Sequence, residues 1–310
     1  MSQPIVSVVI ATHNRSGYLA RALQSLALQT FPKCSYEVIV VDNASTDGTK
    51  EVILGFCKAY SFFRHVCEKR LGSNNARNTG WRSSQGKYVA FIDDDAIADE
   101  KWIETIVSTF DRIIPQPGIV GGMVEPLWEG NKPDWLKGKM FRSLSILEYG
   151  EKERFLTEKE FFFSVNMAIR RELIEKAGGF NNVVSRSGKN LNTNDEIPIA
   201  INIRKMGYGF YYDPSISVKH IIPEERLRTY FAQGYSDALM WEQMEKPGFR
   251  EKSQRAFMYL YYFGRNPKYI ARLLLTPSDY ENLYKKLIAH AWLGFIRGLF
   301  SKIAPRWTNL

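Results

Sequence analysis

The chain of 310 residues is long enough for one large α/β domain, or for two domains of about 150 residues each. Hydrophobic residues make up 45% of it and charged residues 24%, so it can bury a core and lacks the composition of a disordered protein. No run approaches the roughly 18 apolar residues of a transmembrane helix, and we expect no secretory signal peptide. Three cysteines without metal-ligand spacing favour reduced thiols in the cytosol.

The positive charge is concentrated at the end of the chain, whose formal net charge is +9. Residues 250–310 contain 11 Lys/Arg and 3 Asp/Glu, whereas the first 249 residues contain 31 basic and 30 acidic side chains. A globally basic nucleic-acid-binding protein would spread its charge differently, and the basic tail carries no recognised nucleic-acid-binding module. We therefore expect no nucleic-acid partner and a separate role for the tail.

The first 125 residues alternate between strand-like and helix-like segments. The predicted order is strand 5–10, helix 18–26, strand 37–41, helix 47–59, strand 62–67, helix 73–84 and strand 87–92. The nearly continuous apolar runs are typical of strands buried on both faces of a parallel sheet, and the alternation indicates βαβ units. Polar clusters follow the strands, at the edge where open α/β sheets bind ligands, so this half is predicted to bind a nucleotide.

The second half is less regular. The predicted order is loops over 126–160, a strand over 161–169, a helix over 171–177, a helix over 195–206, strands over 208–212 and 215–220, and helix from residue 224 onward. Pro198 is tolerated in the first turn of its helix, and Gly207 follows that helix as a C-cap.

Three consecutive carboxylates, Asp93, Asp94 and Asp95, follow the fourth predicted strand. Side chains alternate along an extended chain, so Asp93 and Asp95 of this Asp-x-Asp sequence are expected on one side and Asp94 on the other. Oxygen ligands favour Mg²⁺ or Mn²⁺, held by one or two carboxylates together with substrate phosphates. The structural alternative is a solvated acidic turn or an N-cap for a helix near Asp99. Because adjacent carboxylates repel one another without a cation, the sequence favours a metal site.

Two further polar positions have both a binding and a structural interpretation. Asp42 ends the second predicted strand, where a carboxylate can accept hydrogen bonds from a base or a ribose, although Asp47 and its neighbours also suit helix capping. Arg77 lies in a polar stretch between glycines, where it can reach a phosphate or a base edge. A surface arginine on a helix explains Arg77 equally well.

An acidic pair and a histidine complete the candidate residues. Asp195 and Glu196 open the predicted helix 195–206, where the helix dipole favours carboxylates and where a carboxylate can also take a proton from a sugar hydroxyl. His220 ends a predicted strand, where it serves either as a structural histidine or as a third metal ligand.

Several catalytic motifs are missing from the sequence. It contains no phosphate-binding Gly-x-x-x-x-Gly-Lys-[Ser/Thr], no Gly-x-Gly-x-x-Gly, no His-Glu-x-x-His and no Gly-x-Ser-x-Gly. These absences argue against a P-loop NTPase, a dehydrogenase, a zincin and an α/β-hydrolase.

Taken in order, the polar segments resemble the family 2 inverting glycosyltransferases, which have the GT-A fold. The resemblance rests on segments 7–15, 40–47, 72–80, 91–95, 166–172, 178–180 and 195–208 and covers roughly residues 4–230. It implies an α/β fold, in which a GT-A type nucleotide-binding mixed sheet is flanked by helices and followed by a helical C-terminal extension.

The resemblance also implies roles for individual residues. The nucleotide-binding residues are Thr12, Asn14, Arg15, Asp42, Arg77, Asp93 and Asp94; the metal ligands are Asp95 and His220; the catalytic residues are Glu196 and Asp195. Counting back from Gly207 puts Glu196 at the position of the base, but the family more often has Glu-Asp where this chain has Asp-Glu, so both carboxylates stay candidates. Val165 stands where the family usually has a small residue, which leaves the shape of the sugar pocket open.

The function implied is that of a metal-dependent inverting glycosyltransferase using Mn²⁺ or Mg²⁺. It would move a sugar from a nucleotide-sugar donor, with UDP-sugars favoured, to a saccharide or lipid-linked acceptor in polysaccharide or glycolipid synthesis. Residues 1–125 would bind the donor, residues 126–245 the acceptor, and residues 246–310 would form the basic helical extension. The expected location is the cytoplasm, including the inner face of the membrane.

The tail and the function each have an alternative. Residues 284–307 have helical apolar spacing, with basic residues and aromatic side chains, which suits either contact with an anionic membrane face or packing on the catalytic domain. A non-catalytic sugar-nucleotide-binding protein or scaffold would explain the same motifs. A sugar-nucleotide nucleotidyltransferase is disfavoured, because its Gly-rich basic signature is missing after the first strand.

Overall fold

The computed structural model describes residues 3–130, 141–142, 144–181 and 196–223. The chain divides into two compact units, of which the first, Met1–Leu127, Leu144–Gly188 and Asp195–Ile222, contains nearly all of the described residues. The predicted helix from residue 224 onward, the amphipathic segment 284–307 and Asp195 lie outside the described residues.

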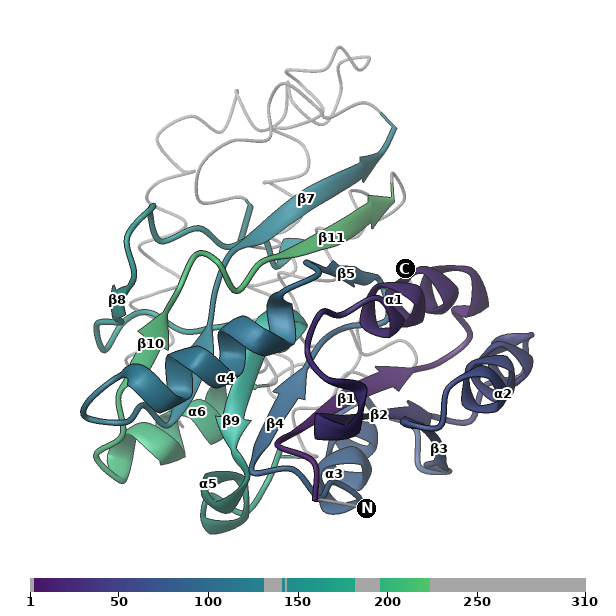
Figure 1. Ribbon diagram of the computed structural model, residues 1–310, viewed down its shortest axis with the longest axis horizontal. Helices are drawn as coiled ribbons and strands as arrows, with labels where there is room; N and C mark the ends of the chain where they lie inside the picture. The colour runs from purple at the N-terminus through teal and green to yellow at the C-terminus, as the bar shows by residue number, and fades with distance from the viewer. Residues whose placement is uncertain (1–2, 131–140, 143, 182–195, 224–310) are drawn as a thin grey trace, which may run out of the picture. The chain divides into compact units, whose positions relative to one another are not determined.

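The first unit is built on an eight-stranded mixed sheet with the order β3-β2-β1-β4-β9-β6-β10-β8 (Figure 1). Its strands are β1 (Val6–Thr12), β2 (Tyr36–Asp42), β3 (Phe63–Cys67), β4 (Tyr88–Phe91), β6 (Ile119–Gly121), β8 (Arg154–Phe155), β9 (Met167–Arg170) and β10 (Phe210–Tyr212). Strands β1 to β4 are parallel, whereas β9 runs antiparallel to both β4 and β6. The carboxyl ends of β1, β2 and β4 therefore meet at one edge of the sheet.

A second, three-stranded sheet brings a distant part of the chain to that edge. It has the order β5-β11-β7, with β5 at Ala96–Ala98, β11 at Val218–Pro223 and β7 at Val124–Glu129. Strand β5 begins one residue after Asp95, and β11 pairs with it antiparallel, with His220 opposite Ala96. The pairing therefore carries His220 to the end of β4.

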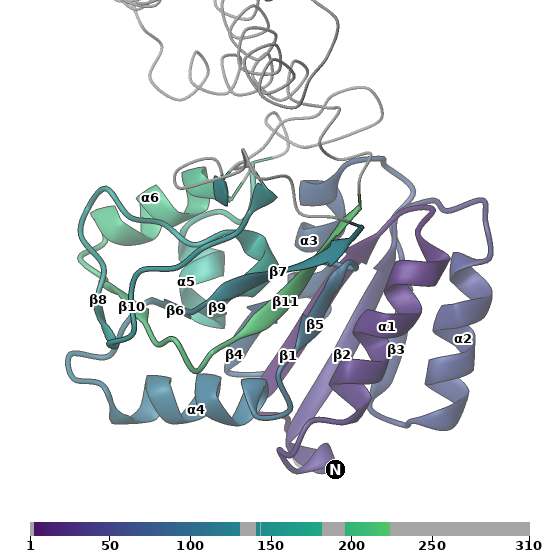
Figure 2. The ribbon, with the colours of Figure 1, turned by 90° about the horizontal axis from the view of Figure 1, so that it is seen from above.

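Helices cover both faces of the large sheet. They are α1 (Ser16–Ala27), α2 (Thr49–Ala59), α3 (Ser73–Arg82), α4 (Trp102–Arg112), α5 (Arg171–Lys176) and α6 (Ile197–Lys205). Figure 2 shows α1, α2 and α4 on one side of the sheet and α3, α5 and α6 on the other. A β-carbon on Gly80 of α3 would lie 2.3 Å from Val9 Cγ1, so this glycine lets α3 pack closely against β1.

Most predicted elements of the first 92 residues are confirmed within a few residues of their bounds. The strand predicted over 161–169 is wrong in its first half, because residues 164–166 form a 3₁₀ turn and β9 begins at Met167. The loop-rich prediction for 126–160 is wrong at 126–129 and at 154–155, which belong to β7 and β8. The sequence analysis also missed α4 as an element of its own.

Buried asparagine side chains tie distant loops together around the sheet. Asn78 accepts a hydrogen bond from the Phe180 backbone N–H and donates one to the Phe180 carbonyl, at 2.9 and 2.8 Å. Asn166 donates to the carbonyls of Met123 and Ile216 and accepts from the Trp102 indole N–H. Because an amide donates as well as accepts, these two residues satisfy backbone carbonyls that an ionised aspartate could not satisfy.

Glu68 stabilises the segment between β3 and α3, and the contribution of its charge can be tested by unfolding at low pH. Its carboxylate accepts hydrogen bonds from the Arg70 guanidinium and from the Thr79 hydroxyl. The hydrogen bond from Arg70 is the largest of the effects that together lower the pKa of Glu68 to about 2. The ionised carboxylate therefore stabilises the fold above pH about 4.5, and this stability is lost as the pH falls through about 2.

We expect Glu68→Gln to lower the free energy of unfolding at neutral pH by about 1 kcal/mol. The difference from wild type should shrink between pH about 4.5 and 2, as measured by urea unfolding at a series of pH values. Glu51→Gln, at an exposed position on α2, is the control and should leave the pH profile unchanged. A Gln variant whose deficit stays constant down to pH 2 would contradict this role of the Glu68 charge.

Candidate functional site

Three aspartates lie in the turn between β4 and β5. Asp94 and Asp95 are buried, and the side chain of Asp93 is 32% exposed. Asp93 and Asp95 both direct a carboxylate oxygen toward His220, and the three ligand atoms lie within 4.8 Å of one another. Asp94 turns instead toward β1, where its Oδ2 accepts a hydrogen bond of 2.7 Å from the Thr12 hydroxyl. This arrangement follows the alternation of side chains.

The hydrogen bonds of His220 fix the orientation of its buried ring. Its Nδ1 lies 3.0 Å from the carbonyl oxygen of Leu144, and its Nε2 lies 3.1 Å from Asp95 Oδ1. A carbonyl oxygen can only accept, so Nδ1 carries a proton and donates. The Nε2 atom then faces a carboxylate oxygen across a space that must hold either a proton or a metal cation. A backbone carbonyl on the far nitrogen is the usual support of a metal-binding histidine.

These residues fit a divalent cation. One ligand atom from each of two carboxylates and an imidazole lies within 4.8 Å of the others, which is a spacing that a divalent cation can bridge. His220 lies at the centre of β11, a position set by the backbone pairing with β5, so its approach to Asp95 does not depend on a flexible loop.

Arg15 lies on the other side of the buried aspartates. Its Nη2 donates to Asp95 Oδ2 at 2.8 Å, and its Nη1 lies 3.3 Å from Asp94 Oδ1. Burial raises the pKa of Asp94 above its usual range, and the positive charge of Arg15 opposes this effect. Arg15 therefore acts as the counter-ion that lets two adjacent carboxylates stay buried.

Arg77 is a buried residue of α3, with 9% of its surface exposed, so its interpretation as a surface arginine is wrong. Its guanidinium donates to Asn74 Oδ1 at 3.1 Å and to the Ser164 hydroxyl at 2.7 Å, and lies 3.6 Å from Asp93 Oδ1. The sequence analysis missed Ser164, because only the tertiary fold brings residue 164 to α3.

The loops that follow β1 and β2 are hydrogen-bonded to each other beside this cluster. Asn14 has a left-handed backbone with φ of 53°, and its side-chain oxygen accepts from the Thr46 N–H. Asp42 is buried; its Oδ1 accepts from the Ser45 N–H, and its Oδ2 lies 4.0 Å from His65 Nε2. His65, on the neighbouring strand β3, was also missed. A buried carboxylate that faces an open strand end can accept hydrogen bonds from a ligand as well.

The capping chemistry predicted beside Asp42 is also present. Asp47 Oδ1 accepts a hydrogen bond of 3.0 Å from the Thr49 backbone N–H, where α2 begins. The capping interpretation is therefore confirmed at Asp47, whereas the binding interpretation of Asp42, at the end of β2, stays a prediction.

The contacts join Thr12, Arg15, Arg77, Asp93, Asp94, Asp95 and His220 into one cluster. Asp42 and Asn14 lie in the adjoining loops, and Glu196 is not among the residues that these contacts join. Glu196 is buried at the residue before α6, where the predicted acidic pair was expected to open a helix. Asp195 lies outside the described residues.

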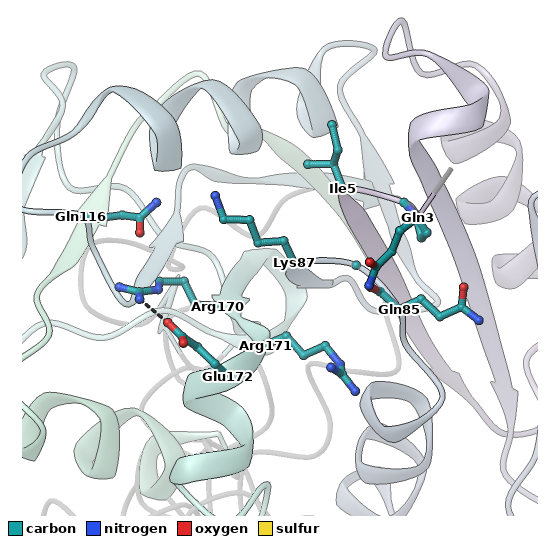
Figure 3. Close-up of a pocket in the computed structure, with 10 residues that line it drawn as sticks. Gln3, Ile5, Gln85, Lys87, Gln116, Arg170, Arg171 and Glu172 are labelled. Atoms are coloured by element: carbon teal, nitrogen blue, oxygen red, sulfur yellow. Dashed lines mark hydrogen bonds and ion pairs between the residues drawn. The ribbon is translucent and has the colours of Figure 1, made fainter. Parts of the chain in front are cut away.

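A hollow of about 440 Å³ lies at the opposite edge of the sheet (Figure 3). It is lined by residues that precede β1 and β4 and by residues at the junction of β9 and α5. Figure 3 shows that its three cationic side chains, Lys87, Arg170 and Arg171, extend in different directions, and Arg170 pairs with Glu172. They do not converge on a common point in this view.

The fold is that of the GT-A glycosyltransferases, as two solved structures with low sequence identity show. A mannosyltransferase from Pyrobaculum calidifontis, solved with GDP-mannose and Mn²⁺, superposes with a TM-score of 0.62 at 20% identity, covering 100% of this chain and 89% of that one. TarS of Staphylococcus aureus, residues 1–349 with UDP-GlcNAc, gives 0.55 at 15% identity and covers 98% of this chain and 93% of that one.

The chain belongs to glycosyl transferase family 2, whose family model matches residues 7–178, more than half of its length. It is 34% identical over 186 residues to the glycosyltransferase AglE of Haloferax volcanii, covering 60% of this chain and 59% of AglE. It is 28% identical over 244 residues to the glucosyl-dolichyl phosphate glucuronosyltransferase of the same organism, covering 76% of this chain and 77% of that protein.

Among the residues that the structure describes, no helix is both long and apolar enough to cross a membrane.

Proposed function

We propose that this protein is a metal-dependent inverting glycosyltransferase that moves a sugar from a nucleotide-sugar donor to an acceptor hydroxyl. The observation that supports this most directly is the convergence of Asp93, Asp95 and His220 at the carboxyl end of β4. Ligands of open α/β sheets bind at this edge. Membership of glycosyl transferase family 2 supports the same activity.

The donor is proposed to lie across the carboxyl ends of β1, β2 and β4. Asp42 and the backbone at Thr12 would bind the base, with Asn14 shaping the loop between them, and Asp93 would hold the ribose. Arg77 is fixed by Asn74 and Ser164 beside Asp93, within reach of a negatively charged donor. Asp95 and His220, with Asp93 nearby, would hold Mn²⁺ or Mg²⁺.

In the proposed reaction, Glu196 or Asp195 removes the proton from the acceptor hydroxyl as its oxygen attacks the anomeric carbon. The bond to the nucleoside diphosphate breaks on the opposite side, so the configuration inverts and the bonding electrons leave with the diphosphate. A bound divalent cation would supply charge stabilisation for that leaving group. The rigid sheet edge positions the reactants, and a carboxylate base contributes about 10²–10⁴-fold to the rate.

A saccharide or lipid-linked acceptor is the second part of the proposal, with a place in polysaccharide or glycolipid synthesis. It is supported by the resemblance to a glucuronosyltransferase whose named substrate is glucosyl-dolichyl phosphate. The basic amphipathic segment 284–307 would bring the enzyme to the anionic inner face of a membrane, where such acceptors lie. Residues 126–245 would form the acceptor side of the domain.

The donor can be identified by thermal unfolding of the purified protein with UDP-, GDP- and dTDP-sugars, each with Mn²⁺ or with chelator. A ligand present at 100 times its Kd stabilises the folded state by about 2.7 kcal/mol. We expect one donor class to raise the melting temperature only when Mn²⁺ is present. UDP-sugars are favoured as the donor. GDP-sugars are screened beside them, because a structural neighbour was solved with GDP-mannose.

Assays with the same donors distinguish a catalytic glycosyltransferase from a protein that only binds nucleotide sugars. A glycosyltransferase releases the free nucleoside diphosphate when an acceptor, or slowly water, attacks the sugar. Stabilisation by the donor without any release of diphosphate would favour a non-catalytic binding protein. Formation of pyrophosphate from a nucleoside triphosphate and a sugar phosphate would favour a nucleotidyltransferase.

A further inference from the structure

Arg15 is held between the two buried aspartates of the metal-binding turn. Its guanidinium contacts Asp95 Oδ2 at 2.8 Å and Asp94 Oδ1 at 3.3 Å. Its backbone N–H donates to the Thr49 hydroxyl, and its guanidinium lies 5.1 Å from the centre of the Tyr18 ring. Arg15 directly precedes α1, so the start of this helix determines where the positive charge lies.

The charges of the cluster nearly balance without any metal. Three carboxylates, Asp93, Asp94 and Asp95, face the guanidinium groups of Arg15 and Arg77. This leaves at most one negative charge in excess. A divalent cation that entered the cluster alone would make it net positive and would lie close to the partly exposed Arg15, beside the buried Asp94, Asp95 and His220, where charges are screened less than in water.

Arg15 also limits the ligands that Asp95 can offer. Asp95 Oδ2 accepts the hydrogen bond from Arg15, and Asp95 Oδ1 faces His220 Nε2. A carboxylate can bind a cation through one oxygen or through both. Arg15 therefore competes with a cation for Oδ2 of Asp95.

We propose that Arg15 is a built-in counter-cation that makes metal binding depend on the diphosphate of the donor. This inference rests on the proposed function. The negative charges of a nucleoside diphosphate offset those of Arg15 and the incoming cation, so metal and nucleotide each strengthen the binding of the other. Without nucleotide, Arg15 holds the aspartates in place and keeps the affinity for free metal low.

The test is Mn²⁺ binding to the chelator-treated full-length protein, measured by electron paramagnetic resonance of free Mn²⁺, with and without UDP or GDP. We expect Arg15→Gln to bind Mn²⁺ alone at least tenfold more tightly than wild type. The factor by which nucleotide tightens Mn²⁺ binding should fall correspondingly. Arg21→Gln removes the same charge from the exposed face of α1 and should behave as wild type.

Equal or weaker Mn²⁺ binding by Arg15→Gln than by wild type would overturn the role of Arg15 and leave the proposed function intact. Failure of the wild-type protein to bind Mn²⁺ with either nucleotide would instead overturn both. Arg15→Lys keeps the charge and should stay within about threefold of wild type, because electrostatic repulsion acts through charge rather than through the shape of the group. A tenfold change in Arg15→Lys would contradict the charge argument.

The role of Arg15 can still be tested if the Arg15→Gln variant fails to fold. Its unfolding is followed by circular dichroism in chelator and then during Mn²⁺ titration. If Arg15 stands in for the cation, Mn²⁺ should restore the folded state of the variant, since a ligand that binds only the native state stabilises it. A variant that stays unfolded at saturating Mn²⁺ would rule out this role.

Discussion

Replacing Asp95 with asparagine is expected to lower glycosyl transfer by about 10²-fold or more and to abolish the Mn²⁺-dependent stabilisation by nucleotide. Asp95 is the residue that Arg15 and His220 share, through separate oxygens. Asparagine keeps the shape of the side chain but removes the negative charge, so the cluster becomes too positive to hold a divalent cation. Release of nucleoside diphosphate over a Mn²⁺ series, together with melting curves, measures both effects.

Asp99→Asn is the matched control for this substitution. Asp99 is an exposed carboxylate four residues further along the chain, and its Oδ1 accepts from the Lys101 N–H, as an asparagine oxygen also can. The control should keep full activity and full metal dependence. Wild-type turnover by Asp95→Asn in the presence of chelator would disprove assistance by a metal at this site.

The second large effect is expected at the acidic pair before α6. If Glu196 is the base, Glu196→Gln should lose about 10²–10⁴-fold in transfer, because the amide cannot take the proton of the acceptor hydroxyl. Donor binding should be largely unchanged, because glutamine keeps the size and hydrogen-bonding reach of Glu196 and removes only its ability to take a proton. The measurement is the rate of transfer at saturating donor, alongside the melting shift with nucleotide and Mn²⁺.

The matching variant Asp195→Asn assigns the base between the two residues. Whichever carboxylate acts, its variant loses rate and keeps the nucleotide-induced melting shift, whereas the other variant stays near wild type. Glu172→Gln removes an exposed carboxylate at the start of α5 and serves as the control. Full activity in both variants of the acidic pair would remove this site from the mechanism.

The parallel half of the fold could be predicted because its strands are unambiguous. Every residue of β2 is buried, and β1 and β4 are nearly as apolar, so each shows as a continuous run between polar turns. The short strands β7 and β8 escaped prediction, since their residues are largely half-buried or exposed. They are strands because of their partners rather than their composition.

Helix α4 shows a different reason for a missed element. Its apolar residues Trp102, Ile103, Ile106 and Phe110 have helical spacing and are all buried. Periodicity alone could have found this helix, but the preceding aspartates were weighed mainly as ligands.

The candidate site also has one part that the sequence predicts and one part that it does not. The sequence predicted that Asp93 and Asp95 share one side, because this follows from local geometry. It was wrong in ending a strand at His220, since β11 spans Val218–Pro223 and continues beyond that residue. It could not predict the ion pairs of Arg15 with Asp94 and Asp95 or the bond from Arg77 to Ser164, which join residues about 80 or more positions apart. Such contacts depend on how the strands are ordered in the sheet, which no local pattern records.

The pairing of β11 with β5 sets the earliest moment during synthesis at which the candidate metal site can be complete. His220 follows Asp95 by 125 residues, so at ribosomal rates it emerges roughly 6–25 s later. Strands β1 to β4 can pair before then, because their partners all lie within the first 91 residues. A nascent or prematurely terminated chain therefore lacks His220, the third member of the candidate metal site, until β11 has paired with β5.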